Sequence, residues 1–244
     1  MNSFERYVDE IKRLVCEVSE KQADGIEKAA ALVADALCGE GYVFTFGTGH
    51  SHLLAEEIFY RAGGLARVCP IFEDSLMLHR SASLSSQLER APGLARILLD
   101  DVEVVKNGGV IFIFSNSGCN TVAVEMAEEA RARGLSTVCI TNLTHSARSK
   151  SRHPMGKKLY EVCDVVIDNM GCYGDAAIEI DGTVTGATST VIGAMVMQAV
   201  VCRGIELAKE RGGSPEVFQS ANTAGGDSAN VDYIKKYKPF VKAL

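Results

Sequence analysis

Short runs of apolar residues alternate with helical patterns along most of the chain. Most of these runs are nearly uninterrupted, which is typical of strands in a parallel sheet with helices on both faces. Five runs are predicted to be strands: residues 42–46, 66–72, 109–114, 136–141 and 164–167. Between them, and most clearly over 120–133, apolar residues recur three and four positions apart, which predicts amphipathic helices. The alternation predicts an α/β fold with a single doubly wound, five-stranded parallel sheet flanked by helices.

Helical patterns also lie at both ends of this region. An apolar stripe beginning at Phe4 predicts a helix over residues 3–22, and the alanine-rich stretch 25–38 predicts another. The stretch 182–202 is uncharged and about as long as a membrane span, but its threonines and glutamine indicate a buried helix with its lead-in. From about residue 212 to 244 the chain is polar and rich in glycine. We expect either a flexible tail or a cap over a bound ligand, touching hydroxyl groups through Asn222, Asp227 and Asn230.

Length and composition narrow the class of protein. A chain of 244 residues without repeats or linkers is expected to form one domain, since domains usually contain about 100–200 residues. Acidic residues outnumber basic ones by 31 to 25, which argues against a nucleic acid or an anionic membrane as partner. Residues 1–13 carry charges throughout, unlike a secretory signal. The eight cysteines are too widely spaced for a CxxC motif, and we expect a reduced, cytoplasmic protein.

Ligands of open parallel sheets bind beyond the carboxyl ends of the strands, so the residues after each apolar run are the first candidates for a site. The first strand is followed by Gly47-Thr-Gly49-His50-Ser51-His52 and then by a helical pattern. Glycines permit a tight turn and the following helix start offers free amides. The motif is not a dinucleotide fingerprint, because its sixth position is His52 instead of glycine. The alternative is a structural turn with Ser51 as helix cap.

The third strand is followed by a second polar loop, Ser115-Asn-Ser117-Gly-Cys-Asn120-Thr121, directly before the strongest helical pattern. We name residues 115–120 the serine loop. Hydroxyl groups and backbone amides at a helix N-terminus hold a phosphate without a lysine, because the helix end supplies positive potential. Seven consecutive small or polar residues exceed what helix capping requires, although a capped turn remains the alternative. The loop therefore predicts an anion cradle.

The two loops together resemble the sugar isomerase (SIS) domain. This family includes phosphoheptose isomerase, the isomerase half of glucosamine-6-phosphate synthase and N-acetylmuramic acid 6-phosphate etherase. The likeness extends over roughly residues 30–210. The chain also resembles a group of uncharacterised stand-alone phosphosugar isomerases, through six short segments: residues 145–146, 151–154, 168–169, 173–175, 220–222 and 225–227.

The resemblance implies a flavodoxin-like three-layer fold, a homodimer or higher homo-oligomer, and a small-molecule phosphosugar as ligand. We expect no cofactor. The phosphate would be bound by Ser51, Ser115, Ser117, Asn120 and Thr121. The sugar would lie over the strand ends, where we expect contacts with Gly47, Gly49, His50, Asn142, Asn169 and Ser189.

Aldose–ketose isomerisation needs a base that moves a proton between neighbouring carbons, and an acid that opens the sugar ring. Glu57 is the candidate base, because Ala55-Glu-Glu57 resembles the Ala-Glu-Glu of phosphoheptose isomerase, although its distance from the glycine turn is shorter. A solvated helix face is the alternative. The histidine of the late helix in that enzyme has no counterpart in residues 188–191. We expect His79 and His145 to take its place as catalytic residues.

Two further clusters carry chemistry. The basic run 148–158 would close over a phosphate or attract anionic substrates, unless it is an ordinary exposed loop. His50, His52 and Glu56 have the side chains of a metal site, but they lie on a single turn of the chain, and we expect no metal. Three functions stay open: a sugar-phosphate isomerase, a lyase of the etherase type acting on an N-acetylated sugar phosphate, and a phosphosugar-binding module without turnover.

Overall fold

The computed structural model describes residues 1–223 and 225–244. At its centre lies a five-stranded sheet of order β2-β1-β3-β4-β5, in which all neighbours run parallel. The strands are β1 (Tyr42–Gly47), β2 (Val68–Pro70), β3 (Gly109–Phe114), β4 (Ser136–Thr141) and β5 (Val165–Asp168). The predicted fold class is confirmed. Strand order reverses between β1 and β3, which is where ligands bind in doubly wound sheets.

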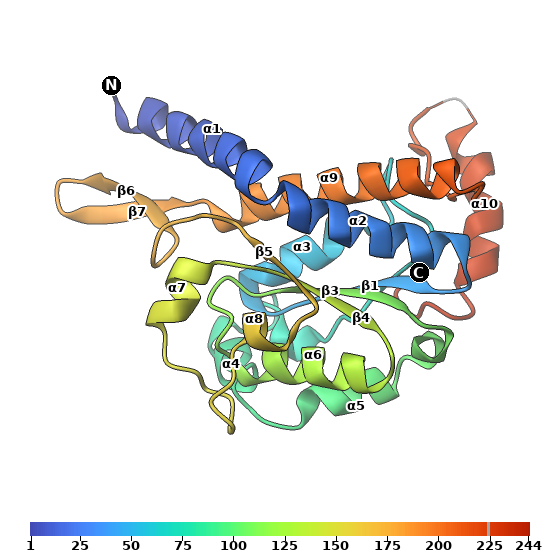
Figure 1. The fold of residues 1–244 in the computed structure, drawn as a ribbon, viewed down its shortest axis with the longest axis horizontal. Coiled ribbons are helices and arrows are strands. Elements are labelled where there is room, and N and C mark those ends of the chain that lie inside the picture. Colours follow the sequence, from blue (N-terminus) through green and yellow to red (C-terminus); the bar gives the residue numbers. More distant parts are fainter. Residues whose placement is uncertain (224) are drawn as a thin grey trace.

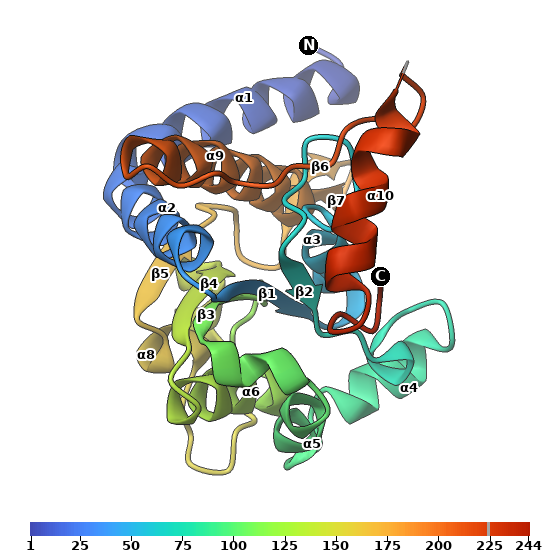
Figure 2. The same cartoon turned by 90° about the vertical axis from the view of Figure 1, so that its right-hand side faces the viewer.

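Helices cover both faces of the sheet (Figures 1 and 2). One layer holds α2 (Ala23–Cys38), α3 (His52–Glu56) and α9 (Ser189–Glu210), with α1 (Ser3–Lys21) packed on its outer side, and the other holds α5 (Leu94–Asp100), α6 (Thr121–Ala132) and α8 (Leu159–Val162). Side chains of a strand alternate between the faces. On β3, Val110 and Phe112 belong to the first core, while Ile111 and Ile113 belong to the second. This two-sided burial explains why the strands are almost uninterrupted apolar runs.

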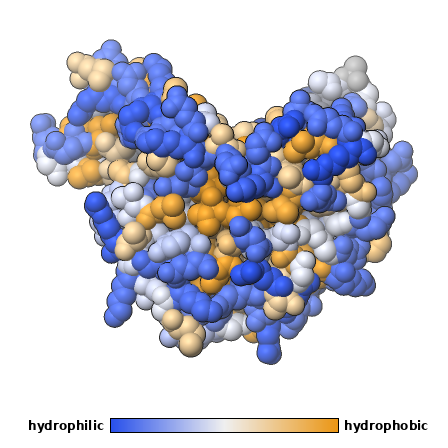
Figure 3. All heavy atoms as spheres, in the orientation of Figure 1, coloured by the Kyte–Doolittle hydropathy of each residue, from blue (hydrophilic) through white to orange (hydrophobic). Residues whose placement is uncertain are grey.

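The long helix α9 packs along α2 at close range. A Cβ atom added to Gly204 would lie 2.7 Å from Cγ1 of Val33, so only glycine permits this approach. By length and composition α9 is able to cross a membrane. In this structure its Ile192, Val196 and Val200 side chains are fully buried in the protein core. The side of α9 that faces away from the sheet forms the floor of a notch between α1 and the C-terminal helix α10 (Gly226–Tyr237) (Figures 1 and 3).

Ahead of α9 lies a two-stranded hairpin that the sequence analysis did not predict. Strands β6 (Ala176–Ile180) and β7 (Thr183–Ala187) pair antiparallel and project from the body beside α1 (Figure 1). The turn is Asp181-Gly182, with φ angles of 47° and 84°. An Asp-Gly pair with both residues at positive φ is the usual two-residue hairpin turn, so the signal was present in the sequence. The remaining short helices are α4 (Ala82–Leu88), α7 (Leu143–Arg148), and the 3₁₀ turns η1 (Gly49–Ser51), η2 (Asp74–Leu76) and η3 (Glu103–Asn107).

The C-terminal segment is folded beyond what its polar composition suggested. Helix α10 (Gly226–Tyr237) stands beside the edge strand β2 (Figure 2), and a bridge between Leu65 and Val217 extends the sheet edge. Tyr237 and Val241, four residues apart, are buried in the second core. The side chain of Asn230 bonds the backbone N–H and C=O groups of Gln219. Asn230 therefore stabilises this segment.

Candidate functional site

Two loops from adjacent strands meet at the point where strand order reverses. The loop after β1 contains η1, and the serine loop follows β3. They border a cavity of about 140 Å³ at the carboxyl ends of the strands, which we name the strand-end cavity. Its lining is His50, Ser51, Leu54, Ser115, Asn116, Ile140, Asn169, Asp175, Ser189 and Thr190. Five residues expected from the sequence thus come together here: His50, Ser51, Ser115, Asn169 and Ser189.

The conformation of the serine loop is fixed by a hydrogen bond inside the loop and by packing against two buried side chains. The hydroxyl oxygen of Ser115 accepts a hydrogen bond of 3.2 Å from the backbone N–H of Gly118. Gly118 has φ 58°, and a Cβ atom there would lie 3.0 Å from the hydroxyl oxygens of both Thr141 and Ser146. Both hydroxyls are fully buried, and Ser146 Oγ has no hydrogen-bond partner within the described residues. The loop thus rests on two side chains that leave no room for a larger residue than glycine.

Three amide side chains connect the ends of β3, β4 and β5. Asn169 donates to the side-chain oxygen of Asn116 at 2.7 Å, and Asn142 donates to the side-chain oxygen of Asn169 at 2.9 Å. Asn142 also donates to the carbonyl of Gly171 at 2.7 Å, and its side-chain oxygen accepts from the N–H of His145. Asn142 is therefore engaged beneath the site and does not line the cavity. Asn116 was not expected, although its place between two serines was a signal.

A carboxylate occupies the N-terminus of α9. Asp175, at φ 60°, accepts hydrogen bonds from the backbone N–H groups of Thr188 and Ser189, at 3.0 and 2.9 Å, and from both hydroxyl groups. The positive potential of this helix end is therefore matched by the protein's own carboxylate. Asp175 and Ser189 both line the strand-end cavity, and Asp175 was not among the predicted site residues.

The other predicted phosphate ligands lie on the far side of the serine loop. Ser117 borders a second, larger cavity of about 650 Å³, which we name the basic cavity. Asn120 and Thr121 both bind Arg152, in the segment before α8. Asn120 accepts a hydrogen bond of 2.8 Å from the guanidinium of Arg152, and Thr121 donates one of 2.9 Å to its carbonyl. Thr121 is buried. The predicted cradle is thus divided between two cavities.

Gly47 and Gly49 form the turn between β1 and η1. A Cβ atom on Gly47 would collide with the backbone carbonyl of Ser51, and Gly49 has φ 56°. Both glycines are thus required by the backbone course of the turn. The tight turn that Gly47 and Gly49 permit determines where His50 and Ser51 lie.

His145 borders the basic cavity. Its ring lies tilted against that of Tyr173 at a centroid distance of 4.9 Å, and its Nδ1 accepts a hydrogen bond of 3.1 Å from the backbone N–H of Gly174. Burial lowers the pKa of His145, and the carboxylate of Asp175 opposes this effect in part. With Nδ1 as acceptor, the neutral ring carries its proton on Nε2.

The three predicted catalytic residues do not meet in one cavity. Glu57 accepts a hydrogen bond of 2.9 Å from Gln198 of α9 and forms an ion pair with Arg61. It borders a separate hollow of about 460 Å³ that shares Leu54 and Thr190 with the strand-end cavity. His79 is exposed, 3.8 Å from a carboxylate oxygen of Asp74.

The histidines near η1 do not form a metal cluster. His52 is buried, its Nε2 lies 2.6 Å from a carboxylate oxygen of Glu56, and its ring packs edge to face against that of Phe72. His50 is exposed and borders the strand-end cavity instead. Within residues 1–223 and 225–244, no group of three His, Cys, Asp or Glu side chains is placed to hold a metal ion.

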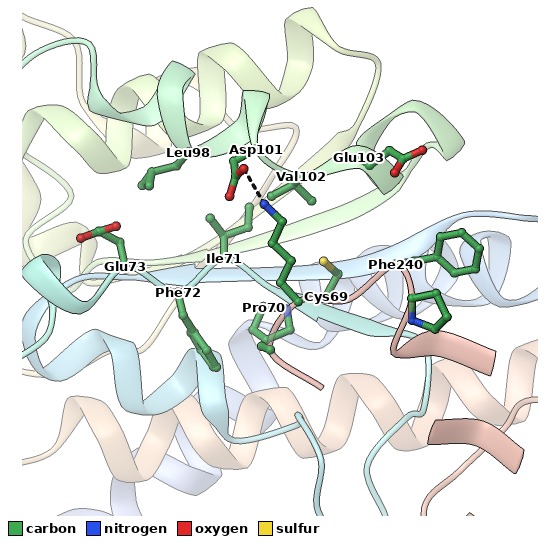
Figure 4. A pocket seen from close by; sticks show the side chains of 13 residues that line it. Cys69, Pro70, Ile71, Phe72, Glu73, Leu98, Asp101, Val102, Glu103 and Phe240 are labelled. Atoms are coloured by element: carbon green, nitrogen blue, oxygen red, sulfur yellow. Dashed lines mark hydrogen bonds and ion pairs between the residues drawn. The ribbon is translucent and has the colours of Figure 1, made fainter. Parts of the chain in front are cut away.

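A further hollow of about 440 Å³ lies along the outer side of β2, between α5 and the C-terminal segment (Figure 4). Lys242, in its lining, forms an ion pair with Asp101. Burial raises the pKa of the Cys69 thiol in its wall to about 12, so the thiol is unreactive at neutral pH. None of the residues predicted for the site borders this hollow, and we assign it no role.

The fold and the two loops define an α/β protein with a candidate ligand site at the switch point of its sheet. The profile of the SIS domain matches residues 6–142, which is more than half of the chain. A UPF0309 protein of Halalkalibacterium halodurans is 43% identical over 238 residues, covering 97% of this chain and 98% of its own length. The chain therefore belongs to the SIS domain family, and within it to the UPF0309 proteins. The resemblance found in the sequence is confirmed.

Solved structures share the fold at low sequence identity. Phosphoheptose isomerase GmhA from Neisseria gonorrhoeae has a TM-score of 0.52 at 14% identity, covering 84% of this chain and 97% of that one. The Vibrio vulnificus NanR protein complexed with ManNAc-6P also has a TM-score of 0.52 at 14% identity, covering 98% of this chain and 69% of that one. These similarities establish the architecture.

Proposed function

We propose that this protein binds a sugar phosphate at the strand-end cavity and interconverts its aldose and ketose forms. One observation carries the proposal: the hydroxyl groups of Ser51 and Ser115, from two separate loops, border one cavity at the switch point of the sheet. The serine loop leads into α6, whose first backbone amides add donors and positive potential. The phosphosugar named in the NanR complex and the isomerase activity named for GmhA support a ligand of this class.

Calorimetric titration with a panel of aldose and ketose phosphates tests binding. Replacing both hydroxyls, Ser51→Ala with Ser115→Ala, is expected to weaken binding at least about tenfold, since two hydrogen bonds to a charged group are lost. The control removes two exposed hydroxyls elsewhere, Ser19→Ala with Ser228→Ala, and keeps full affinity. Unchanged binding by the Ser51/Ser115 variant would contradict the proposal.

Two side chains are candidates for the proton transfer. His50 borders the cavity itself. Glu57, the base proposed from the sequence, borders the adjoining hollow behind Leu54 and Thr190. Asp175 is less suited to act as a base, because its two oxygens already accept four hydrogen bonds.

The variants Glu57→Gln and His50→Gln separate these two groups. Loss of the base is expected to lower kcat about 100-fold or more while KM changes little. Turnover is followed by NMR as conversion of aldose phosphate to ketose phosphate. Full activity of both variants would remove this acid–base assignment.

Binding without turnover is the second candidate function. It is favoured by the arrangement of Glu57, whose carboxylate is already engaged by Arg61 and Gln198 outside the strand-end cavity. A protein of this kind would bind the phosphosugar in calorimetry and leave it unchanged in the NMR assay. Conversion of any sugar in the panel excludes this candidate.

We further propose that the protein acts in the cytoplasm as a homodimer paired through exposed apolar side chains of α3 and α9. All eight cysteines are free, in keeping with a reducing compartment. Two apolar side chains of neighbouring helices are exposed, Leu53 of α3 at 47% and Val191 of α9 at 44%. Val191→Glu is expected to give monomers in light scattering, whereas Ile97→Glu, on exposed α5, is expected to leave the dimer intact. A monomeric wild-type protein would contradict this proposal.

A further inference from the structure

The basic cavity gathers positive charge in a protein whose formal charge is −6. Its lining contains three cations and no carboxylate: Ser117, Cys119, His145, Arg148, Ser149, Lys150, Ser151, Arg152 and Tyr173. Within the described ranges, 1–223 and 225–244, none of the three cations forms a salt bridge. The nearby Lys157, which lies outside the lining, is paired with Glu128. The positive charge of this cavity is thus left for a ligand.

The basic cavity is held in a fixed relation to the serine loop. The backbone N–H of Arg152 donates to the carbonyl of Cys119 at 2.9 Å, and its guanidinium donates to Asn120 at 2.8 Å. The guanidinium of Arg148 lies 5.6 Å from the centre of the Tyr173 ring, which also lies tilted against that of His145. Cation–π contact and hydrogen bonds restrict these side chains before a ligand arrives, which reduces the entropy lost on binding.

The serine loop forms a wall of both cavities. Ser115 and Asn116 face the strand-end cavity, and Ser117 and Cys119 face the basic cavity. The strand-end cavity, at about 140 Å³, is smaller than the roughly 300–1,000 Å³ usual for pockets of small molecules. The basic cavity, at about 650 Å³, provides the missing space. A ligand that spans the loop would place one end among hydroxyl groups and the other among cations.

We propose that the basic cavity binds a second anionic group of the ligand, a carboxylate or a further phosphate, so that this protein selects sugar phosphates that carry two separate anionic groups. Arg148 and Lys150 bind the second anion, and Arg152 holds their loop against the serine loop. The neutral ring of His145 offers an additional donor at Nε2. The proposal rests on the proposed function, since it names the class of phosphosugar taken by the same site.

Three pairs of compounds that differ by one anion test this selectivity in calorimetry. They are glucose 6-phosphate and 6-phosphogluconate, fructose 6-phosphate and fructose 1,6-bisphosphate, and phosphate and pyrophosphate. The last pair contains no sugar and therefore tests the charges independently of sugar configuration. The member of each pair with the additional anionic group is expected to bind at least about tenfold more tightly, because it gains charge-assisted hydrogen bonds to arginine and lysine.

The variant Arg148→Gln/Lys150→Gln is expected to abolish this difference in affinity. Its affinity for the compounds with one anionic group is expected to stay within about twofold of the wild-type value. The variant Lys235→Gln/Lys238→Gln removes the same charge from the exposed end of α10 and is expected to retain the difference. Equal binding within the pairs, or an unchanged preference in the Arg148/Lys150 variant, would overturn this inference alone. Absence of binding by all six compounds would overturn it together with the proposed function.

Discussion

The carboxylate of Asp175 accepts hydrogen bonds from both the backbone N–H and the hydroxyl group of Ser189, the first residue of α9. The two residues are fourteen positions apart, with the whole β6–β7 hairpin between them. This contact joins the loop after β5 to the longest helix of the protein at the wall of the strand-end cavity. The hairpin therefore returns the chain to the site from which it departs.

Asp175→Asn is expected to lower the free energy of unfolding by about 1 kcal/mol, because the helix end loses a charged acceptor. Asparagine tolerates the positive φ of this position, so backbone strain is not introduced. Chemical denaturation measures the change. Asp181→Asn is the control, because Asp181 also has positive φ but is exposed in the hairpin turn. The free energy of unfolding of this control variant should match that of the wild type. Equal losses in both variants would contradict a capping role for Asp175.

Gly118→Ala is expected to destroy phosphosugar binding. The added Cβ would press against the buried hydroxyls of Thr141 and Ser146, and the serine loop would have to move. Gly134→Ala is a matched control with φ 82° and no atom within 4 Å of the added Cβ, so it introduces backbone strain alone, about 1–2 kcal/mol. Calorimetric titration compares the two. Normal binding by Gly118→Ala would show that the loop conformation is not needed.

His145 should make stability depend on pH. Burial lowers its pKa in the folded protein below the ordinary value of 6.5, so the unfolded chain binds more protons between the two pKa values. The free energy of unfolding therefore rises with pH in this window, and the contribution is complete above 6.5 and lost as the pH falls toward the folded pKa. The carboxylate of Asp175 opposes the shift in part, and the cations Arg148, Lys150 and Arg152 line the same cavity as the ring.

Denaturation curves on both sides of this window are expected to show a larger acid-induced loss of stability for the wild type than for His145→Gln. NMR titration of the His145 ring gives its pKa directly. A ring that titrates above 6.5, or identical pH profiles of the two proteins, would contradict the burial of the neutral form.

Tyr237→Ala should test whether the C-terminal segment belongs to the domain. Tyr237 is 3% exposed, packs edge-on against Tyr42, and donates a hydrogen bond to Glu216. Loss of a buried aromatic ring is expected to lower the free energy of unfolding by about 3 kcal/mol or more. Phe240→Ala, at 48% exposure, is expected to change it by less than about 1 kcal/mol. A loss of stability in Tyr237→Ala as small as that in Phe240→Ala would mean that α10 does not contribute to the cooperative stability of the domain.

The sequence by itself determined the architecture and predicted where the candidate site lies. Burial of both sheet faces requires nearly continuous apolar strands, and this local pattern placed all five strands within a few residues. The glycine and serine loops follow β1 and β3 directly, so their meeting at the switch point followed from the predicted topology. Of the phosphate ligands expected, Ser51 and Ser115 lie together for this reason.

Only the tertiary structure decided which side of each loop faces which cavity. Ser115 and Ser117 are two residues apart, yet the turn at Gly118 directs them into different spaces. Glu57 and Gln198, or Asp175 and Ser189, become partners through the packing of α9, which no local spacing encodes. The physical reason is that periodicity reports burial within one element, whereas the chemistry of a site depends on distances between elements, and these are set by how the whole core packs.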